Sequence, residues 1–479
     1  MAKILMVASE AAPFVKTGGL ADVVGALAPA LAASGEEVAV VLPKYRAIRL
    51  DRAERVFHEM PIWLGASLYN VAIDELQSEG VRFYFVDCPA LYDRAGIYNE
   101  KNLDYPDNPV RFAVLCRAAL GIVRHLFRPR ILHAHDWPAA LVAPYARHLL
   151  AGDPTFLGIK LLLTIHNMGY QGIFPRAALA ELGFDDSVLS PGGMEFFGQI
   201  NFLKAGIVWS DAINTVSPTY AREIQTPEFG FGLDGLLRDR AAALSGILNG
   251  AHYAEWNPEH DPQLSHRYSA DDLTGKLSSK LALLAEFGLS ADTGNRPLLG
   301  IVSRMADQKG FDLIAAIESE LMAENVALVV LGSGDPRYET MFRELARSYP
   351  DRAGVRIGYD EALAHRIEAG ADIFLMPSRY EPCGLNQMYS LRYGTPPVVR
   401  ATGGLNDTIE DSTGFKFAEY SGRALLRAIR EALNEYRSPD RWQARMRRGM
   451  RKNFPWKVAA SQYAALYGRL AEGSADLHP

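Results

Sequence analysis

The sequence predicts an α/β protein built from two doubly wound domains in tandem. Short apolar runs rich in β-branched residues recur in both halves of the chain, and helical patterns separate them. This alternation is typical of parallel sheets with helices on both faces. The length of 479 residues also exceeds what one ordinary hydrophobic core holds, and it suits two or three domains.

The first domain is predicted from buried strands in the N-terminal half. They are apolar throughout, as strands covered on both faces should be. These strands are expected at residues 3–8, 37–42, 81–87, 131–135, 160–167 and 212–217. After the first of them, Val23, Val24 and Leu27 share one face of a helix that contains Pro29 and ends near Gly35.

The same pattern restarts in the C-terminal half and predicts a second domain. Its strands are expected at residues 297–305, 326–334, 354–359, 371–378 and 395–400. The Gly-, Pro- and Asn-rich segment 246–262 reads as a hinge or a linker of fixed shape, so we place the domains at 1–245 and 246–455. In the basic segment 441–453, the spacing of Trp442, Met446 and Met450 favours a packed helix with a solvated cationic face.

Composition excludes several classes of function. The net charge of −6 argues against a general nucleic-acid binder. No apolar run reaches the ~18 residues of a membrane span. Three cysteines (Cys88, Cys116 and Cys383) are too few for a disulfide framework and fit a reducing cytoplasm.

Ligands of doubly wound domains bind beyond the carboxyl ends of the strands, and residues suited to anions lie there. Lys16, Thr17, Gly18 and Gly19 follow the first strand and precede a helix. Exposed amides and the helix dipole favour an anion at such a position, although a Gly-Gly turn with a surface lysine is the alternative. The segment TGGLND at 402–407 repeats the arrangement in the second domain.

Charged residues also follow strands of the second domain. Arg304 and Lys309 suit a diphosphate, with surface salt bridges as the alternative. Glu381 follows a buried strand, where a carboxylate can stabilise a developing positive charge or orient a sugar. Cys383 is better explained by packing than as a nucleophile, because no partner histidine is evident in the sequence.

Polar and aromatic residues follow two strands of the first domain. In HAHDW (133–137), His133 and His135 would share a strand face while Asp136 would point the other way, which favours a cleft wall over a metal site. His166, Asn167, Tyr170 and Gln171 follow the next strand. Rings and amides together suit a sugar, although His166 could instead be a satisfied core residue. Two such domains that together hold a nucleotide diphosphate and sugars are typical of a glycosyltransferase.

The chain resembles the bacterial glycogen synthase and plant starch synthase family over nearly its whole length. The similarity rests on KTGGLADVVGALAPAL, DYPDNPVRFAVLCRAAL, HAHDW, TIHNMGYQG, FFGQINFLKAGIVWSD, TVSPTYAREIQTPEFGFGLDGLL, GILNG, SRMADQKGFDL, SRYEPCGLNQMYSLRYGT and TGGLNDTI. It implies the GT-B fold, two Rossmann-like domains facing a deep interdomain cleft, with a final helix in 456–479 that crosses back onto the first domain. It also implies closure on binding.

The resemblance implies transfer of glucose from ADP-glucose to the non-reducing 4-OH of an α-1,4-glucan (glycogen or a maltooligosaccharide), with retention and release of ADP. The catalytic group would comprise Lys16, His166, Arg304, Lys309 and Glu381. Donor contacts would come from Lys16, Gly18, Gly19, Arg304, Lys309, Tyr359, Cys383, Gly384, Leu385, Thr402 and Gly403. Acceptor contacts would come from Asp136, His166, Tyr170, Gln171 and Asn249.

One position departs from the broader superfamily, in which a second carboxylate lies eight residues after the first. Here that position is Tyr389. Because Arg and Lys side chains can neutralise the leaving diphosphate, we expect no cofactor and no metal ion. A UDP-glucose transferase and a non-catalytic glucan- or nucleotide-sugar-binding protein are the alternatives.

Overall fold

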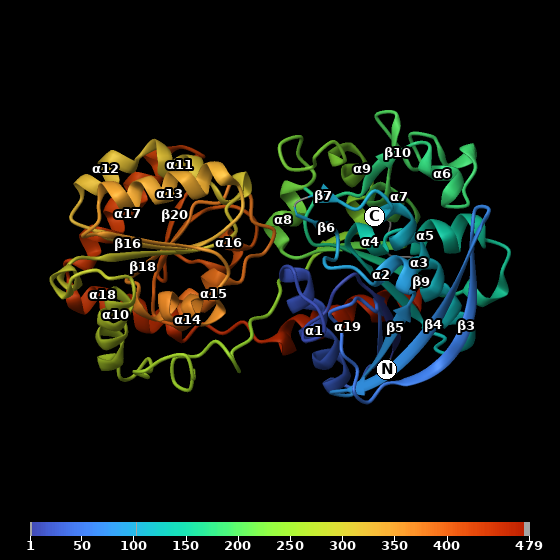
Figure 1. Cartoon of the computed structure of the whole chain (residues 1–479), viewed down its shortest axis with the longest axis horizontal. Coiled ribbons are helices and arrows are strands. Elements are labelled where there is room, and N and C mark those ends of the chain that lie inside the picture. Colours follow the sequence, from blue (N-terminus) through green and yellow to red (C-terminus); the bar gives the residue numbers. More distant parts are fainter. Residues whose placement is uncertain (1, 102, 474–479) are drawn as a thin grey trace. The chain divides into compact units, whose positions relative to one another are not determined.

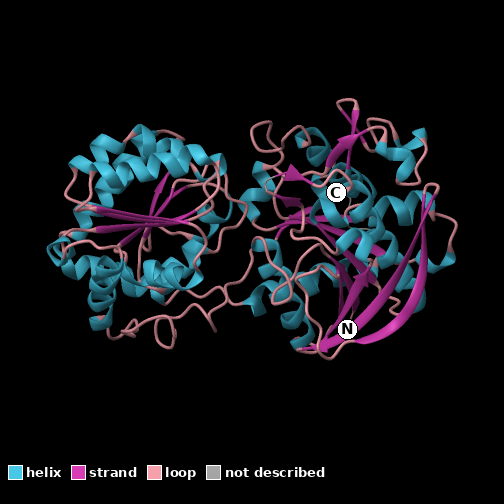
Figure 2. Ribbon diagram, viewed as in Figure 1, coloured by secondary structure: helices cyan, strands magenta, loops and turns pink. Residues whose placement is uncertain are grey.

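A computed structural model describes residues 2–101 and 103–473, and it divides the chain into two compact units. Unit 1 contains the chain up to Val216, the segment Ala221–Gly250 and the chain from Trp456 on; unit 2 contains Ser217–Tyr220 and Ala251–Pro455. Residues 474–479, the end of the predicted segment 456–479, lie outside the described residues. Each unit is a sheet with helices on its faces, which confirms the predicted α/β class (Figure 1 and Figure 2).

Unit 1 is built on a sheet of nine described strands in the order β14-β13-β9-β8-β1-β2-β5-β4-β3. The strands from β14 to β5 are parallel, and β4 and β3 add an antiparallel edge. Their bounds are β1 Lys3–Val7, β2 Glu37–Pro43, β3 Glu54–Leu64, β4 Ser67–Ser78, β5 Val81–Asp87, β8 Ile131–His135, β9 Lys160–Ile165, β13 Ala212–Thr215 and β14 Leu244–Gly246. The six strands predicted for this half are confirmed.

Helices and short strands complete unit 1. Helix α1 (Gly19–Ala33) buries Val23, Val24 and Leu27 as predicted, and Gly35 follows it with a φ of +98°. The other α-helices are α2 Pro89–Tyr92, α3 Asn108–His125, α4 Asp136–Ala139, α5 Val142–Pro144, α6 Ala178–Glu181, α7 Phe202–Trp209, α9 Asp234–Asp239 and α19 Trp456–Glu472. Helix α8 (Pro218–Glu223) has its first half in unit 2 and its second half in unit 1. The short strands are β6 Asn99–Glu100, β7 Leu103–Asp104, β10 Ile173–Pro175, β11 Glu195–Phe196 and β12 Gln199–Asn201.

The final helix, α19, packs in unit 1 although it follows all of unit 2 in the chain. It buries Tyr463, Leu466, Tyr467 and Leu470 along one side. The Tyr463 hydroxyl accepts a hydrogen bond from the Asn214 amide at 2.8 Å, so the helix is fixed to β13 by a polar contact as well as by apolar packing.

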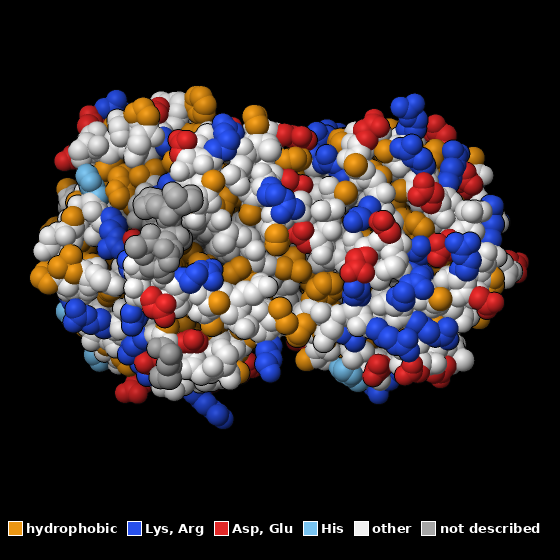
Figure 3. Space-filling view, turned by 180° about the vertical axis from the view of Figure 1, so that it is seen from behind, with side chains coloured by type: hydrophobic (Ala, Val, Ile, Leu, Met, Phe, Trp, Pro, Cys, Tyr) orange, Lys and Arg blue, Asp and Glu red, His pale blue; other side chains and the backbone are white. Residues whose placement is uncertain are grey.

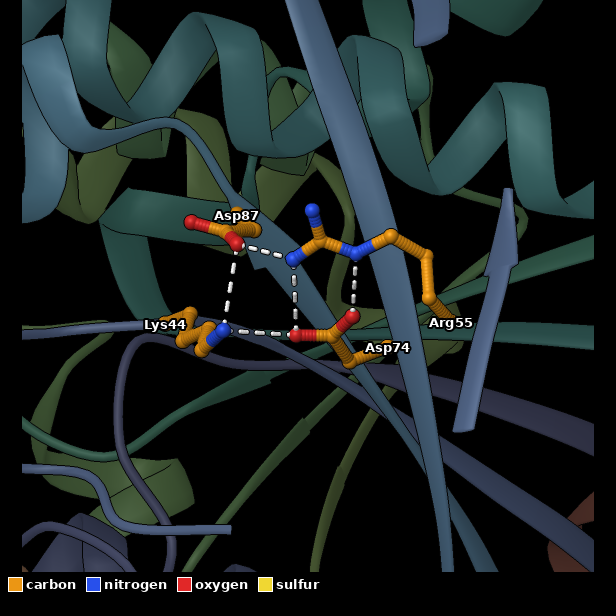
Figure 4. A network of polar contacts seen from close by, with 4 residues as sticks. All are labelled: Lys44, Arg55, Asp74 and Asp87. Carbon is orange, nitrogen blue, oxygen red and sulfur yellow. Dashed lines mark hydrogen bonds and ion pairs between the residues drawn. The ribbon is translucent and has the colours of Figure 1, made fainter. Parts of the chain in front are cut away.

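The long β3–β4 hairpin was not predicted from the sequence. It carries an ion network around the buried Asp74 on β4, whose carboxylate accepts hydrogen bonds from Lys44 at 2.7 Å and from Arg55 at 2.8 Å (Figure 4). Asp87, at the end of β5, pairs with the same two cations. Burial opposes the charged form of Asp74, but the hydrogen bonds from Arg55 and Lys44 outweigh it and lower the pKa of this carboxyl.

Unit 2 is built on a parallel sheet of six described strands in the order β17-β16-β15-β18-β19-β20. The strands are β15 Leu298–Val302, β16 Ala327–Gly332, β17 Ala353–Ile357, β18 Ile373–Met376, β19 Pro397–Arg400 and β20 Phe415–Phe417. The helices are α10 Thr274–Glu286, α11 Phe311–Ala316, α12 Glu318–Ala323, α13 Pro336–Ser348, α14 Glu361–Gly370, α15 Asn386–Arg392, α16 Gly403–Thr408, α17 Gly422–Tyr436 and α18 Pro439–Met450. Figure 2 shows helices on both faces of this sheet.

Two further predictions for unit 2 are confirmed. Helix α18 buries Trp442, Met446 and Met450 as predicted. Of its arginines, Arg441 and Arg448 are exposed, whereas Arg445 is buried and pairs with Glu435 at 2.8 Å. The segment after β14 is held in a defined shape, because Trp256 stacks on His365 with ring centroids 3.6 Å apart and Asp261 accepts a hydrogen bond from His365 at 2.8 Å.

The surface shown in Figure 3 intersperses Lys and Arg with Asp and Glu side chains. Among the described residues, no helix is long and apolar enough to span a membrane.

We predict that Asp74→Asn lowers the free energy of unfolding of the β3–β5 region by roughly 2 kcal/mol, because Lys44 and Arg55 would then lose the buried one of their two shared carboxylates. Hydrogen exchange of the β4 and β5 backbone amides measures this. Asp93→Asn, which removes an exposed partner of Arg46, is the control and should change stability by less than about 1 kcal/mol. Equal effects of the two substitutions would contradict the prediction.

Candidate functional site

The segment after β1 forms an open helix N-terminus. Gly18 has an extended backbone and α1 begins at Gly19. A Cβ atom added to either glycine would meet no described atom within 4 Å, so these glycines are not required by packing. Lys16 lies beside them, and its Nζ is 2.8 Å from the Asp22 carboxylate in the first turn of α1. The open backbone beside a cation is the geometry expected of an anion site.

A buried acid lies under this helix start, and the sequence prediction missed it. Glu10 is 3% exposed and accepts hydrogen bonds from the Thr17 amide at 2.5 Å and from the Tyr98 hydroxyl at 2.9 Å. Tyr98 also bonds Ser9 at 2.7 Å. Burial raises the pKa of Glu10 even though these donors favour its charged form. The sequence signal that could have identified Glu10 is its position shortly after the buried strand β1.

The two histidines of β8 share a face, as predicted, with ring centroids 4.0 Å apart. His133 bonds the Tyr467 hydroxyl at 2.9 Å and the Thr164 hydroxyl at 2.7 Å. His135 bonds the ring of His166, which follows β9, at 3.0 Å. The chain of contacts therefore connects His166 through β8 to the final helix.

Asp136 is the first residue of α4 and follows the last residue of β8 directly. Its φ of +59° is unusual for a residue other than glycine, and the strand ends before it. Its carboxylate accepts a hydrogen bond from the His166 amide at 2.8 Å. Asp136 and His166, predicted from separate strand ends, are thus brought together. Among the described residues, no group of three or more His, Cys, Asp or Glu side chains could hold a metal ion, so His133 and His135 join no such group.

Burial sets the charge state of this region. It lowers the pKa of His166 to about 3 and that of His133 to about 3, and it holds the pKa of His135 well below its usual value. It raises the pKa of Asp136 to about 7, against the opposing hydrogen bond from the His166 amide. At neutral pH the imidazoles are uncharged and can donate and accept hydrogen bonds.

The remaining predicted acceptor residues differ in how they are placed. Tyr170 is 50% exposed. Gln171 is buried, and its amide is bonded within the protein: it donates to the carbonyl oxygens of Met168 and Phe231 and accepts from Asn201. Asn249 is also buried, and its Oδ1 atom has no hydrogen-bond partner among the described residues. A buried acceptor of this kind is available to a ligand.

In unit 2, Lys309 and Glu381 form an ion pair at two neighbouring strand ends. Lys309 Nζ lies 2.7 Å from Glu381 Oε2, and the Ser378 hydroxyl donates to the same oxygen at 2.9 Å. Glu381 is 5% exposed. Gly310 permits this approach, because a Cβ there would lie 2.0 Å from the Pro377 carbonyl oxygen. The structure thus places a cation and a carboxylate, predicted separately, in direct contact.

The glycines of TGGLND serve a different purpose from those at 18 and 19. A Cβ at Gly403 would lie 1.9 Å from the Glu381 carbonyl oxygen, and one at Gly404 would lie 2.1 Å from that of Cys383. The Gly404 amide donates to the Glu381 carbonyl at 3.1 Å. These glycines therefore fix the turn that holds Glu381, and the two Thr-Gly-Gly segments are not equivalent.

The other predicted donor residues lie around the same strand ends. Arg304 is exposed after β15, and Tyr359 is 79% exposed after β17. Cys383 and Thr402 are buried, whereas Gly384 and Leu385 are half-buried before α15. Tyr389, at the position of the absent second carboxylate, is buried and stacks on Trp256 with centroids 4.4 Å apart.

Comparison with known proteins identifies the family. Residues 3–239 match the family described as the starch synthase catalytic domain, and residues 290–449 match glycosyl transferases group 1. The chain is 48% identical to the glycogen synthase of Koribacter versatilis, over 99% of both chains. The chain belongs to the starch synthase family of glycosyltransferases.

Further relatives agree with this membership. The glycogen synthase of Anaeromyxobacter dehalogenans is 50% identical over 98% of this chain and 100% of its own length. The catalytic domain of starch synthase IV from Arabidopsis thaliana, solved bound to ADP and acarbose, has a TM-score of 0.89 and 34% identity over 98% of this chain and 99% of that one. The predicted GT-B fold and family are confirmed.

The raised pKa of Asp136 predicts a pH-dependent stability. The unfolded chain loses this proton near pH 4, whereas the folded chain keeps it to about pH 7. Stability from this group is therefore present below pH 4 and lost as pH rises toward 7. Relative to Asp136→Asn, the wild-type free energy of unfolding should fall by roughly 1 kcal/mol per pH unit across this window.

Urea denaturation from pH 4 to 8 measures this difference. Asp239→Asn, at an exposed position of α9, is the control and should give a pH-independent difference. A pH-independent difference for Asp136→Asn as well would contradict the predicted ionisation.

Proposed function

We propose that this glycosyltransferase is a glycogen synthase that transfers glucose from ADP-glucose to the non-reducing 4-OH of an α-1,4-glucan, with retention of configuration and release of ADP. The Lys309–Glu381 pair at the strand ends of unit 2 carries the proposal, since it supplies a cation for phosphate and a carboxylate for sugar in one place. The family membership and the glycogen synthase relatives support it.

The donor is assigned to unit 2. Lys309 and exposed Arg304 neutralise the diphosphate, including the charge that grows as ADP leaves. Glu381 orients the donor glucose and stabilises positive charge at its anomeric carbon.

The remaining donor contacts line the glucose, the phosphate and the base. Gly384, Leu385 and Cys383 line this glucose. Thr402 and Gly403 bind the distal phosphate, and Tyr359 borders the adenine. These contacts come chiefly from strand ends that Gly310, Gly403 and Gly404 hold together.

The acceptor is assigned to unit 1. His166 lies by the reacting carbon, and its uncharged imidazole bonds hydroxyl groups without repelling a developing cation. Asp136 and the unpartnered Asn249 Oδ1 orient the acceptor. Tyr170 offers an exposed ring to a glucosyl unit. Gln171, whose amide is bonded internally, positions the neighbouring loop, and Lys16 with Gly18 and Gly19 completes the binding of the donor phosphates.

Two mechanistic choices follow. Front-face attack guided by the leaving phosphate is favoured over double displacement, because the latter requires a carboxylate directly below the anomeric carbon, and the sequence pattern designates none. Cationic side chains supply the charge neutralisation that a divalent ion supplies in other transferases, so we propose a metal-independent reaction.

Glucan extension on glycogen with ADP-glucose and with UDP-glucose, each with and without EDTA, tests this function. We expect ADP-glucose to be preferred and EDTA to have no effect. Glu381→Ala and Lys309→Ala should each lower turnover by about a thousandfold, because each removes charge stabilisation used in the transition state.

Arg343→Ala, which removes an exposed ion pair with Glu339 on α13, is the matched control and should keep wild-type turnover. Preference for UDP-glucose would favour the alternative donor, and glucan binding without transfer would favour a non-catalytic protein. Chelation that abolishes activity until one metal restores it would contradict the metal-independent reaction.

A further inference from the structure

Two Phe-Gly turns in unit 1 expose aromatic rings to solvent. Phe197 and Gly198 form the tip of the β11–β12 hairpin, and Phe197 is 82% exposed. Phe231 and Gly232 form a second turn before α9, and Phe231 is 39% exposed. Large exposed aromatic side chains in a cluster mark interaction surfaces more often than isolated ones do.

Both phenylalanines also adopt a backbone conformation that disfavours them. Phe197 has a φ of +50° and Phe231 a φ of +49°. Glycine and asparagine adopt this region with less strain, whereas a bulky side chain in it is an outlier. Backbone strain at exposed aromatic residues concentrates at functional sites.

The two turns lie side by side. A Cβ added to Gly232 would lie 3.0 Å from Phe196 Cζ and 3.5 Å from Phe197 Cε2. The rings of Phe196 and Phe197 themselves meet edge to face, with centroids 4.8 Å apart. Phe197 and Phe231 with their two turns thus form one feature, named here the aromatic platform.

Gln171 connects the aromatic platform to the proposed acceptor site. Its amide donates to the Phe231 carbonyl at 3.2 Å and accepts from Asn201, the last residue of β12, at 2.6 Å. It also lies five residues after His166, in the loop that follows β9. One buried side chain therefore connects the Phe231 turn and the end of β12 to the loop that carries His166.

We infer that the aromatic platform is a glucan-binding subsite, at which the rings of Phe197 and Phe231 stack on glucosyl units behind the reacting end of the chain. This inference rests on the proposed function for its ligand. The flat faces of a pyranose ring carry C–H groups that pack on an aromatic ring, while hydroxyl groups at its edge reach polar side chains. Exposed Gln199 on β12 supplies an amide beside Phe197.

A glucan fits this surface better than a protein partner does. The platform consists of two rings on adjacent turns with the polar strand residue Gln199 beside Phe197, whereas protein interfaces need a broader apolar core. The solved relative with a TM-score of 0.89 holds acarbose, an oligosaccharide, in its catalytic domain. The hydrogen bond from Gln171 to the Phe231 carbonyl joins the platform to the loop of the proposed acceptor site.

Calorimetric titration with maltoheptaose, without nucleotide sugar, tests the subsite. Phe197→Asn and Phe231→Asn remove each ring while keeping a residue that tolerates positive φ, so the turns should persist. Each should raise the Kd for maltoheptaose by about tenfold, the loss expected for one stacking contact. Phe197→Tyr should bind within about twofold of wild type. Trp63→Asn, at a 59% exposed aromatic residue of the β3–β4 hairpin, should bind as wild type.

The outcomes separate the subsite from the proposed function. Unchanged binding in both Asn variants, or an equal loss in Trp63→Asn, overturns the subsite even where transfer from ADP-glucose proceeds. A wild-type protein that does not bind maltoheptaose overturns it as well. Ring-dependent binding in a protein that transfers no glucose supports the subsite and overturns only the enzymatic function. A KM for ADP-glucose within about twofold of wild type in the Asn variants shows that their donor site is intact.

Discussion

The ion pair between Lys309 and Glu381 is the contact on which the donor site depends. Its two residues lie more than seventy positions apart, and only the parallel pairing of β15 with β18 brings their strand ends together. Three glycines close the arrangement, since Gly310 packs on the Pro377 carbonyl and Gly403 and Gly404 pack on the turn of Glu381. Lys309 therefore places a cation of the protein itself directly beside the buried Glu381 carboxylate.

The candidate site groups of unit 1 differ in charge from the ion pair of unit 2. The proposed site of unit 1 contains buried groups that burial has made neutral: His166 with a pKa of about 3 and Asp136 with a pKa of about 7. Neutral donors and acceptors suit hydroxyl groups of a sugar, whereas the charged pair of unit 2 suits a diphosphate. The two halves of the chain share a fold and differ in the charge that they present at their strand ends.

The sequence predicted the parallel strands and the helix faces. It also placed the candidate site residues after buried strands, because ligand-binding residues of doubly wound sheets lie there. It did not predict the β3–β4 hairpin, whose alternation is interrupted by register shifts between Arg55 and Met60. It described TGGLND as a repeat of the first Thr-Gly-Gly segment, since only coordinates distinguish an open glycine from one packed on a carbonyl. It missed Glu10 and the internal hydrogen bonds of Gln171, because their partners are distant in sequence.

Calorimetric titration of ADP into the wild type, Lys309→Ala and Glu381→Gln tests most directly whether Lys309 binds phosphate and Glu381 binds glucose. If Lys309 binds phosphate and Glu381 faces glucose, Lys309→Ala raises the Kd for ADP by at least about tenfold, because a charge-assisted contact is lost. Glu381→Gln then leaves the Kd for ADP within about threefold of wild type, since ADP carries no glucose. A loss of ADP affinity in Glu381→Gln as large as that in Lys309→Ala would contradict the account.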